Sequence, residues 1–139
     1  MATHKKVIID TGPLVAFINK HDKYHEWVKK QLALIHPPLL TCEGVLSEAA
    51  FLLRNFSGGS NLVLEYLRRD LLCISFSIEN EVASIQNLML RYNDLPMSFA
   101  DACLVRMAEQ HHDSAILTLD SDFQVYRKNR GQIIPLLFP

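Results

Sequence analysis

The segment Val7-Ile8-Ile9-Asp10-Thr11-Gly12-Pro13 carries the strongest indication of the fold. Three consecutive β-branched apolar residues are typical of a short strand that is buried in the middle of a sheet. Gly12 and Pro13 then break the strand and turn the chain. Asp10 is therefore predicted to stand at the carboxyl end of a central strand, the edge where open α/β sheets bind their ligands.

Apolar strand candidates alternate with helix-length segments along the rest of the chain. The predicted strands are Val7–Ile9, Leu39–Cys42, Leu72–Phe76, Ala115–Leu119 and Ile133–Leu136. The predicted helices are Pro13–Ile18, Asp22–Ile35, Glu43–Phe56, Ser60–Asp70, Glu79–Tyr92 and Phe99–Gln110, with a further turn or two near Phe123–Lys128. This alternation predicts a three-layer α/β/α fold around a parallel sheet of about five strands, and the length predicts one domain over residues 1–139.

The composition is that of an ordinary soluble globular protein, with 49% hydrophobic and 21% charged residues. No apolar run approaches the length of a membrane span, and the start of the chain lacks a secretory hydrophobic region. The three cysteines are widely spaced in apolar segments, which favours reduced core residues of a cytoplasmic protein over disulfides or a zinc site. The net charge of −1 provides no global attraction to nucleic acid.

Four acids lie where strands or helices can bring them to one place: Asp10, Glu48, Asp101 and Asp120. Asp120 follows the apolar run that ends at Leu119, so it is expected at the same sheet edge as Asp10. Within that run, the hydroxyl of Thr118 can face either side of the strand. A cluster of carboxylates without accompanying Cys or His suits Mg²⁺ or Mn²⁺ and predicts phosphate chemistry.

Several acids of the sequence also have a purely structural interpretation. Asp10 can cap the helix that follows it, and Ser98 with Asp101 matches the S-x-x-D pattern of a helix start. Asp122 is as well placed to cap the next short helix as to bind a ligand, and Asp94 is explained as a turn residue. A capping carboxylate at a buried helix start can also hold a metal ion, so the two roles are compatible.

Glu48 is predicted from helical geometry to lie at the border of an apolar stripe. The stripe consists of Val45, Ala49, Leu52, Leu53 and Phe56, while Glu43 and Arg54 point the opposite way. A partly desolvated carboxylate at that border needs a cation or a hydrogen bond to offset its desolvation. The alternative is an edge residue whose carboxylate reaches into solvent.

Taken together, four segments resemble the PIN-domain nucleases, and most closely the VapC-like toxins of bacterial toxin–antitoxin pairs. The segments are Val7-Ile8-Ile9-Asp10-Thr11, Val45-Leu46-Ser47-Glu48-Ala49, Asp94-Leu95-Pro96-Met97-Ser98-Phe99-Ala100-Asp101-Ala102 and Leu117-Thr118-Leu119-Asp120-Ser121-Asp122-Phe123. The resemblance covers nearly the whole chain, and the Asp-x-Pro-x-x-x-Ala-Asp-Ala segment is its most specific part.

This resemblance implies a metal-dependent endoribonuclease that hydrolyses RNA phosphodiester bonds with Mg²⁺ or Mn²⁺. Asp10, Glu48, Asp101 and Asp120 match the acidic quartet of the family, which serves as metal ligands and catalytic residues. Thr11 matches the adjacent hydroxyl residue and Asp122 an accessory acid, whereas Ser98 stands where many relatives carry another Asp. The expected partners are RNA, an antitoxin protein and a second copy of the chain, without a membrane.

Two other functions fit parts of the sequence. Asp10-Thr11-Gly12 matches the short signature of retroviral-type aspartic proteases, but that fold is nearly all β and the long helical patterns argue against it. A non-catalytic binding module with the PIN fold is the other alternative, and the presence of all four acids favours an enzyme over it.

Overall fold

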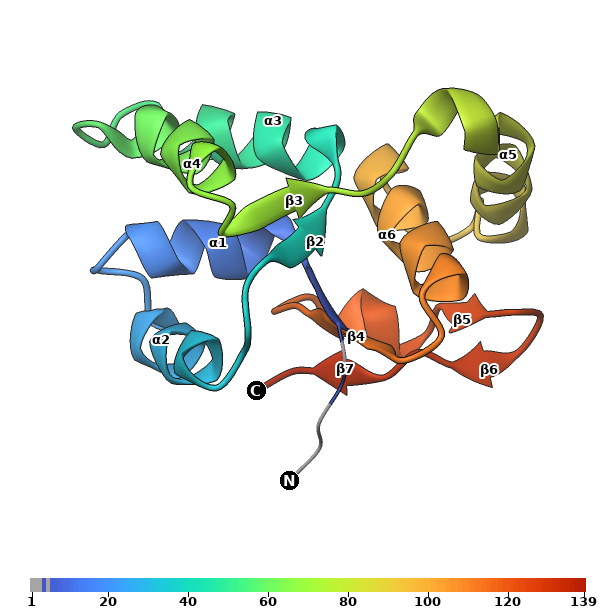
Figure 1. Cartoon of the computed structure of the whole chain (residues 1–139). Coiled ribbons are helices and arrows are strands. Elements are labelled where there is room, and N and C mark those ends of the chain that lie inside the picture. The colour runs from blue at the N-terminus through green and yellow to red at the C-terminus, as the bar shows by residue number, and fades with distance from the viewer. Residues whose placement is uncertain (1–3, 5) are drawn as a thin grey trace.

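The computed structural model describes residue 4 and residues 6–139, and it contains a central sheet of five parallel strands (Figure 1). These are β1 (Lys6–Ile9), β2 (Leu39–Thr41), β3 (Leu72–Ile74), β4 (Ser114–Leu117) and β7 (Leu136–Leu137). Their order is β3-β2-β1-β4-β7, so β1 lies in the middle, with Ile8 beside Leu40 on one side and Ile116 on the other. The prediction of a parallel five-stranded sheet is confirmed.

Helices flank this sheet and complete the predicted three-layer α/β/α architecture. They are α1 (Thr11–Ile18), α2 (His25–Ala33), α3 (Glu43–Leu52), α4 (Gly59–Arg68), α5 (Val82–Arg91) and α6 (Phe99–Gln110), with 3₁₀ turns η1 (Ile78–Glu81) and η2 (Ser121–Gln124). In Figure 1, α1–α4 lie to one side of the sheet and α5 and α6 to the other. The fold is incompatible with the nearly all-β aspartic proteases, so that alternative is wrong.

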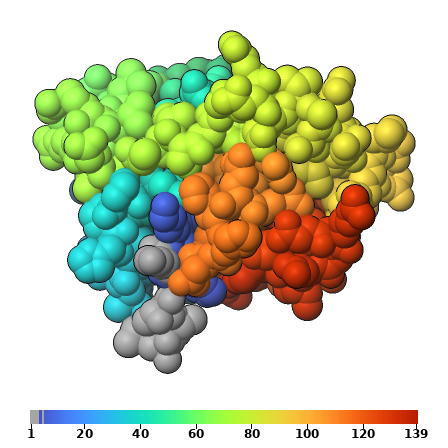
Figure 2. Space-filling model, turned by 45° about the vertical axis from the view of Figure 1, so that its right-hand side comes forward, coloured from blue at the N-terminus to red at the C-terminus, as the bar shows by residue number. Residues whose placement is uncertain are grey.

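The core lies where β1, β4 and α6 pack together. Every residue of β4 is buried, and β1 is buried from Val7 to Ile9. Helix α6 is buried along most of its length, from Asp101 to Val105 and again at Met107 and Ala108. On the face shown in Figure 2, α6 (orange) crosses between the segment around α5 and the C-terminal segment (red). Its packing against β1 and β4 fixes the position of Asp101 near its first turn.

The C-terminal region differs from the sequence prediction. Phe123–Lys128 is not a helix: η2 ends at Gln124, and Arg127–Lys128 forms strand β5, which pairs antiparallel with β6 (Gln132–Ile133). Asn129 and Arg130 adopt positive φ angles of 48° and 66°, a backbone conformation that reverses the chain instead of continuing a helix. The predicted strand Ile133–Leu136 is split, because Pro135 has no N–H to offer a ladder.

Several predicted helices also begin later or end earlier than expected. The helix predicted from Asp22 begins at His25, because the Asp22 carboxylate accepts the Tyr24 N–H at 2.9 Å and holds a turn there. The helix predicted from Glu79 begins as the 3₁₀ turn η1. Helix α3 ends at Leu52, four residues before the predicted end at Phe56.

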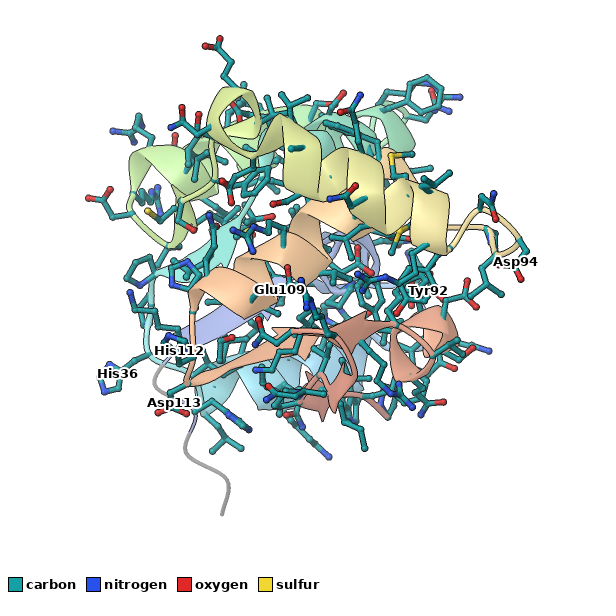
Figure 3. All side chains as sticks on the ribbon, turned by 90° about the vertical axis from the view of Figure 1, so that its right-hand side faces the viewer. His36, Tyr92, Asp94, Glu109, His112 and Asp113 are labelled. Atoms are coloured by element: carbon teal, nitrogen blue, oxygen red, sulfur yellow. The ribbon has the colours of Figure 1, made fainter. Side chains whose placement is uncertain are left out.

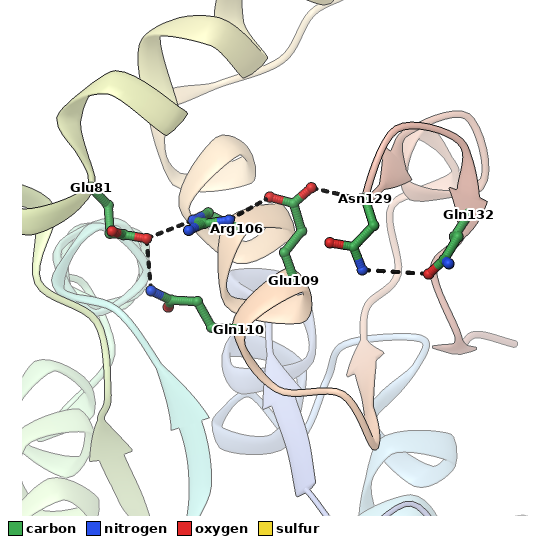
Figure 4. A network of polar contacts seen from close by, with 6 residues as sticks. All are labelled: Glu81, Arg106, Glu109, Gln110, Asn129 and Gln132. Atoms are coloured by element: carbon green, nitrogen blue, oxygen red, sulfur yellow. Dashed lines mark hydrogen bonds and ion pairs between the residues drawn. The ribbon is translucent and has the colours of Figure 1, made fainter.

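A polar network ties α6 to the segments on either side of it (Figure 4). The Arg106 guanidinium donates to Glu81 at 2.6 Å and to Glu109 at 3.1 Å, and Gln110 donates to the same Glu81 oxygen at 2.7 Å. Glu109 also accepts the backbone N–H of Asn129 at 2.7 Å. Because these groups are partly shielded from solvent, the network fixes η1, α6 and the β5–β6 hairpin relative to one another.

The cysteines form no disulfide within the described residues. All three cysteines are free: Cys42 and Cys103 are buried, and Cys73 is half-buried. Within residue 4 and residues 6–139, none of the helices combines the length and the apolar character that crossing a bilayer requires.

Candidate active site

Four acids that are far apart in the sequence line one open cleft of about 570 Å³ at the carboxyl end of the central strands. They are Asp10, Glu48, Asp101 and Asp120, delivered by β1, α3, α6 and the segment after β4. The remaining lining residues are Thr11, Gly12, Pro96, Ser98, Leu119 and Ser121. Asp94 is exposed in the loop after α5, outside this set, where Figure 3 shows its side chain at the periphery.

Asp10 is the most firmly held of these acids. Its backbone N–H donates to Leu117 of β4 at 3.0 Å, and one carboxylate oxygen accepts the Thr11 N–H at 2.7 Å. The other oxygen accepts the Thr118 hydroxyl at 2.8 Å. The carboxylate therefore caps α1 and lines the cleft at the same time. Burial, reinforced by the charges of Asp101 and Asp120, raises the pKa of Asp10 from 3.8 to about 6 despite these hydrogen bonds.

Thr118 connects two of the acids. Its hydroxyl donates to Asp10 and accepts the backbone N–H of Asp120 at 3.0 Å, while the residue itself is fully buried. The sequence left the direction of this hydroxyl open. The sequence did contain one indication of this role: Thr118 is the single hydroxyl residue in the apolar run that leads to Asp120.

Asp101 lies in the first turn of α6, where it forms a capping box with Ser98, as the S-x-x-D pattern predicted. Its Oδ2 atom accepts two hydrogen bonds of 3.2 Å, one from the Ser98 N–H and one from the Tyr126 hydroxyl. Burial and the charge of Asp120 raise the pKa of Asp101 above its usual value. Burial, followed by the charge of Asp101, raises the pKa of Tyr126, so its hydroxyl stays protonated at neutral pH.

Asp120 lies at the sheet edge beside Asp10, where the sequence placed it, but it also takes the capping role that the sequence offered to Asp122. Asp120 caps η2 by accepting the Asp122 N–H at 2.9 Å, so the cap belongs to Asp120 and not to Asp122. Asp120 also lines the cleft, whereas Asp122 is not among the lining residues.

Glu48 reaches the cleft from an exposed position, which corrects the expected partial burial. The buried face of α3 consists of Val45, Leu46 and Ala49, while Leu52 is 48% exposed. The apolar stripe predicted from the sequence is therefore too wide at its C-terminal end, where Leu52 and Phe56 are exposed while Leu53 is buried. Glu43 is exposed and does not line the cleft.

The chemistry of the lining residues suits a hard divalent cation. Carboxylate oxygens are the ligands that Mg²⁺ and Mn²⁺ prefer, and the residues that line the cleft include neither His nor Cys. The Thr11 hydroxyl is buried beside the acids of the cleft and has no hydrogen-bond partner among the described residues, as expected of a group that meets a ligand or its water. Within residue 4 and residues 6–139, no group of three or more His, Cys, Asp or Glu side chains is arranged so that it could hold a metal ion. Binding would require the acids to draw closer together.

Comparisons with known proteins agree with this geometry. The PIN domain family matches residues 7–129, so the chain belongs to the PIN domain family. Its fold is similar to the crystal structure of Mycobacterium tuberculosis VapC20, described as a toxin that cleaves the sarcin–ricin loop. That likeness has a TM-score of 0.74 at 20% sequence identity and covers 86% of this chain and 94% of VapC20. No curated protein matches the sequence.

The raised pKa of Asp10 predicts how the stability of the metal-free protein depends on pH. The folded state holds the Asp10 proton more tightly than the unfolded state does, so Asp10 adds stability as the pH falls through about 6. We expect its contribution to the free energy of unfolding to increase by roughly 1 kcal/mol between about pH 7.5 and about pH 5. Denaturant unfolding in the presence of a chelator measures this increase.

Asp10→Asn imitates the protonated state and should therefore stabilise the metal-free protein at neutral pH. Mg²⁺ or Mn²⁺ should raise the melting temperature of the wild type, because the ion binds only the folded site and relieves repulsion there. The gain should be smaller for the variant. A variant that melts lower than wild type without metal, yet gains as much from metal, would show that these acids do not share a site.

Proposed function

We propose that this protein is a Mg²⁺- or Mn²⁺-dependent endoribonuclease that hydrolyses RNA phosphodiester bonds. The observation that supports this most directly is the convergence of four carboxylates, from separate elements, on one open cleft. Phosphodiester hydrolysis requires charge stabilisation at the phosphate and activation of a water, and a cation held by carboxylates supplies both. The cleft is open and most of its lining residues are polar, which suits the backbone of a nucleic acid.

The residues of the cleft would have different roles in this reaction. Asp10 and Asp101 are fixed by hydrogen bonds and would serve as rigid ligands, while Asp120 and the exposed Glu48 complete the set. The Thr11 hydroxyl, which lacks a partner within the described part of the chain, would orient a water or a phosphate oxygen. One carboxylate of the quartet would accept a proton from the attacking water.

We also propose that the protein is the toxin of a toxin–antitoxin pair and forms a homodimer in the cytoplasm. The similarity of its fold to VapC20 supports the toxin role. Large apolar side chains along α3 and α4 support a protein partner, since Phe51 is 61% exposed and Leu64 is 59% exposed. Either a second copy or an antitoxin would cover such side chains.

The test of the enzymatic proposal is cleavage of labelled RNA by the purified protein. We expect internal cleavage with Mg²⁺ or Mn²⁺ and none with a chelator, with activity restored when the ion is returned. RNA binding without cleavage under all these conditions would favour the non-catalytic PIN-fold module. Growth arrest on expression, relieved by the product of an adjacent reading frame, tests the toxin role separately.

A further inference from the structure

Tyr126 is a buried residue that reaches one of the proposed metal ligands from outside the acidic motifs. Its side chain has no solvent exposure, and it is the largest of the fully buried side chains in the described chain. Its hydroxyl donates to Oδ2 of Asp101 at 3.2 Å across 25 positions of sequence. A buried hydroxyl aimed at a carboxylate of the cleft is a specific feature, because apolar packing alone would be satisfied by Phe.

The surroundings of Tyr126 hold its ring in one orientation. Phe123 and Tyr92 both pack edge-on against it, each with ring centroids 5.2 Å away. The Tyr126 backbone N–H donates to the backbone carbonyl of Asp122 at 3.2 Å, whereas the Tyr92 hydroxyl makes its hydrogen bond elsewhere, with the Arg127 N–H at 2.9 Å. Figure 3 shows Tyr92 at the end of α5, beside the C-terminal segment. The Tyr126 hydroxyl therefore has little freedom to leave Asp101.

The two oxygens of Asp101 are used differently. Oδ2 carries both hydrogen bonds, from Ser98 and from Tyr126, whereas Oδ1 takes part in none of the hydrogen bonds within the described residues. The carboxylate is thus anchored through one oxygen, and the other remains available to the cleft that Asp101 lines. Such partners outside the ligand set fix the orientation of a ligand and strengthen its binding.

We propose that Tyr126 is the positioning residue that orients Asp101 for divalent metal binding. This inference rests on the proposed metal-dependent nuclease function. Tyr126 follows Asp120 by six residues, so it also couples the segment that carries Asp120 to the first turn of α6. Binding of a cation at Asp101 would therefore be sensed by the Tyr126 hydroxyl.

The pair Tyr126→Phe and Tyr92→Phe tests the proposal, because each variant removes one hydroxyl from the same aromatic cluster. We expect Tyr126→Phe to weaken Mn²⁺ binding in calorimetric titration by roughly 10- to 100-fold and to lower kcat, with KM for RNA nearly unchanged. Tyr92→Phe, whose hydroxyl contacts a backbone N–H and no carboxylate, should change Mn²⁺ affinity by less than about twofold. Equal losses in both variants, or wild-type Mn²⁺ affinity in Tyr126→Phe, would overturn the proposal.

A second measurement uses the wild-type protein, which has four tyrosines, and needs no variant of Tyr126 to fold. With ¹³C at the Cζ atom of every tyrosine, Mg²⁺ should shift the Tyr126 resonance most, because only that hydroxyl contacts a proposed ligand. Replacing Tyr24, Tyr66 and Tyr92 by Phe one at a time identifies the Tyr126 signal by elimination. If the Tyr126 resonance does not shift at saturating Mg²⁺, the positioning role of Tyr126 is contradicted but the proposed function is not. A wild-type protein that binds neither Mg²⁺ nor Mn²⁺ would contradict the proposed function as well.

Discussion

Asp10→Asn lowers RNA cleavage by roughly 100- to 1000-fold while the fold stays intact, if Asp10 is the central ligand that its position indicates. Asn has the shape of Asp and can still accept the Thr11 N–H, so the turn into α1 should survive. The variant lacks the negative charge that would hold the cation, and charge stabilisation at the phosphate should be lost with it. Single-turnover cleavage at saturating metal measures the effect.

Asp94→Asn is the matched control for this substitution. Asp94 is exposed and lies outside the cleft, so replacing its carboxylate by an amide should leave the rate of cleavage within about twofold of wild type. Circular dichroism and thermal melting establish that both variants are folded. Wild-type turnover by Asp10→Asn, once contaminating ribonuclease is excluded, would remove Asp10 from the active site.

Glu48→Gln is expected to reduce cleavage on the order of 100-fold, whereas Glu43→Gln is expected to be nearly silent. Both residues are exposed on α3, so loss of a surface charge is common to the two variants. Only Glu48 lines the cleft, and only Glu48 can add a carboxylate to the proposed metal site. The same cleavage assay, run at several Mg²⁺ concentrations, compares them.

The dependence on Mg²⁺ distinguishes a ligand from a distant surface charge. If Glu48 is a ligand, part of the loss in Glu48→Gln should be recovered at high Mg²⁺, because weaker binding is offset by mass action. Equal effects of the two substitutions, or the reverse order, would mean that α3 presents a different face to the substrate than the structure indicates.

The sequence predicted the parts of the site that follow from regular structure. Asp10 and Asp120 were predictable because parallel strands end at a common edge, so an acid after each of two buried strands must come close to the other. Asp101 was predictable because its capping pattern fixed the start of a helix that is apolar over most of its surface. Glu48 was placed on the correct side of α3, although its burial was overestimated, since periodicity does not reveal how much of a stripe a neighbour covers.

Tyr126 could not be predicted, because its role depends on a contact 25 residues away. The sequence around it favoured a short helix, and the reversal at Asn129 and Arg130 instead produced a strand and a hairpin. The same misassignment concealed the division of the last strand at Pro135. Local patterns identify elements, but contacts between buried side chains from distant elements arise only from packing.

The central position of β1 gives the cleft one rigid wall and one compliant wall. Detaching Asp10 from its place requires both β2 and β4 to separate from β1, an opening whose free energy approaches that of global unfolding. Glu48 instead extends from an exposed position on α3, so its side chain can change rotamer without any part of the fold opening. In the proposed nuclease, Glu48 would follow the contour of an irregular RNA while Asp10 keeps the reacting phosphate in register. Tolerance of varied substrate shapes and accuracy at the scissile bond would thus reside in different walls of the same cleft.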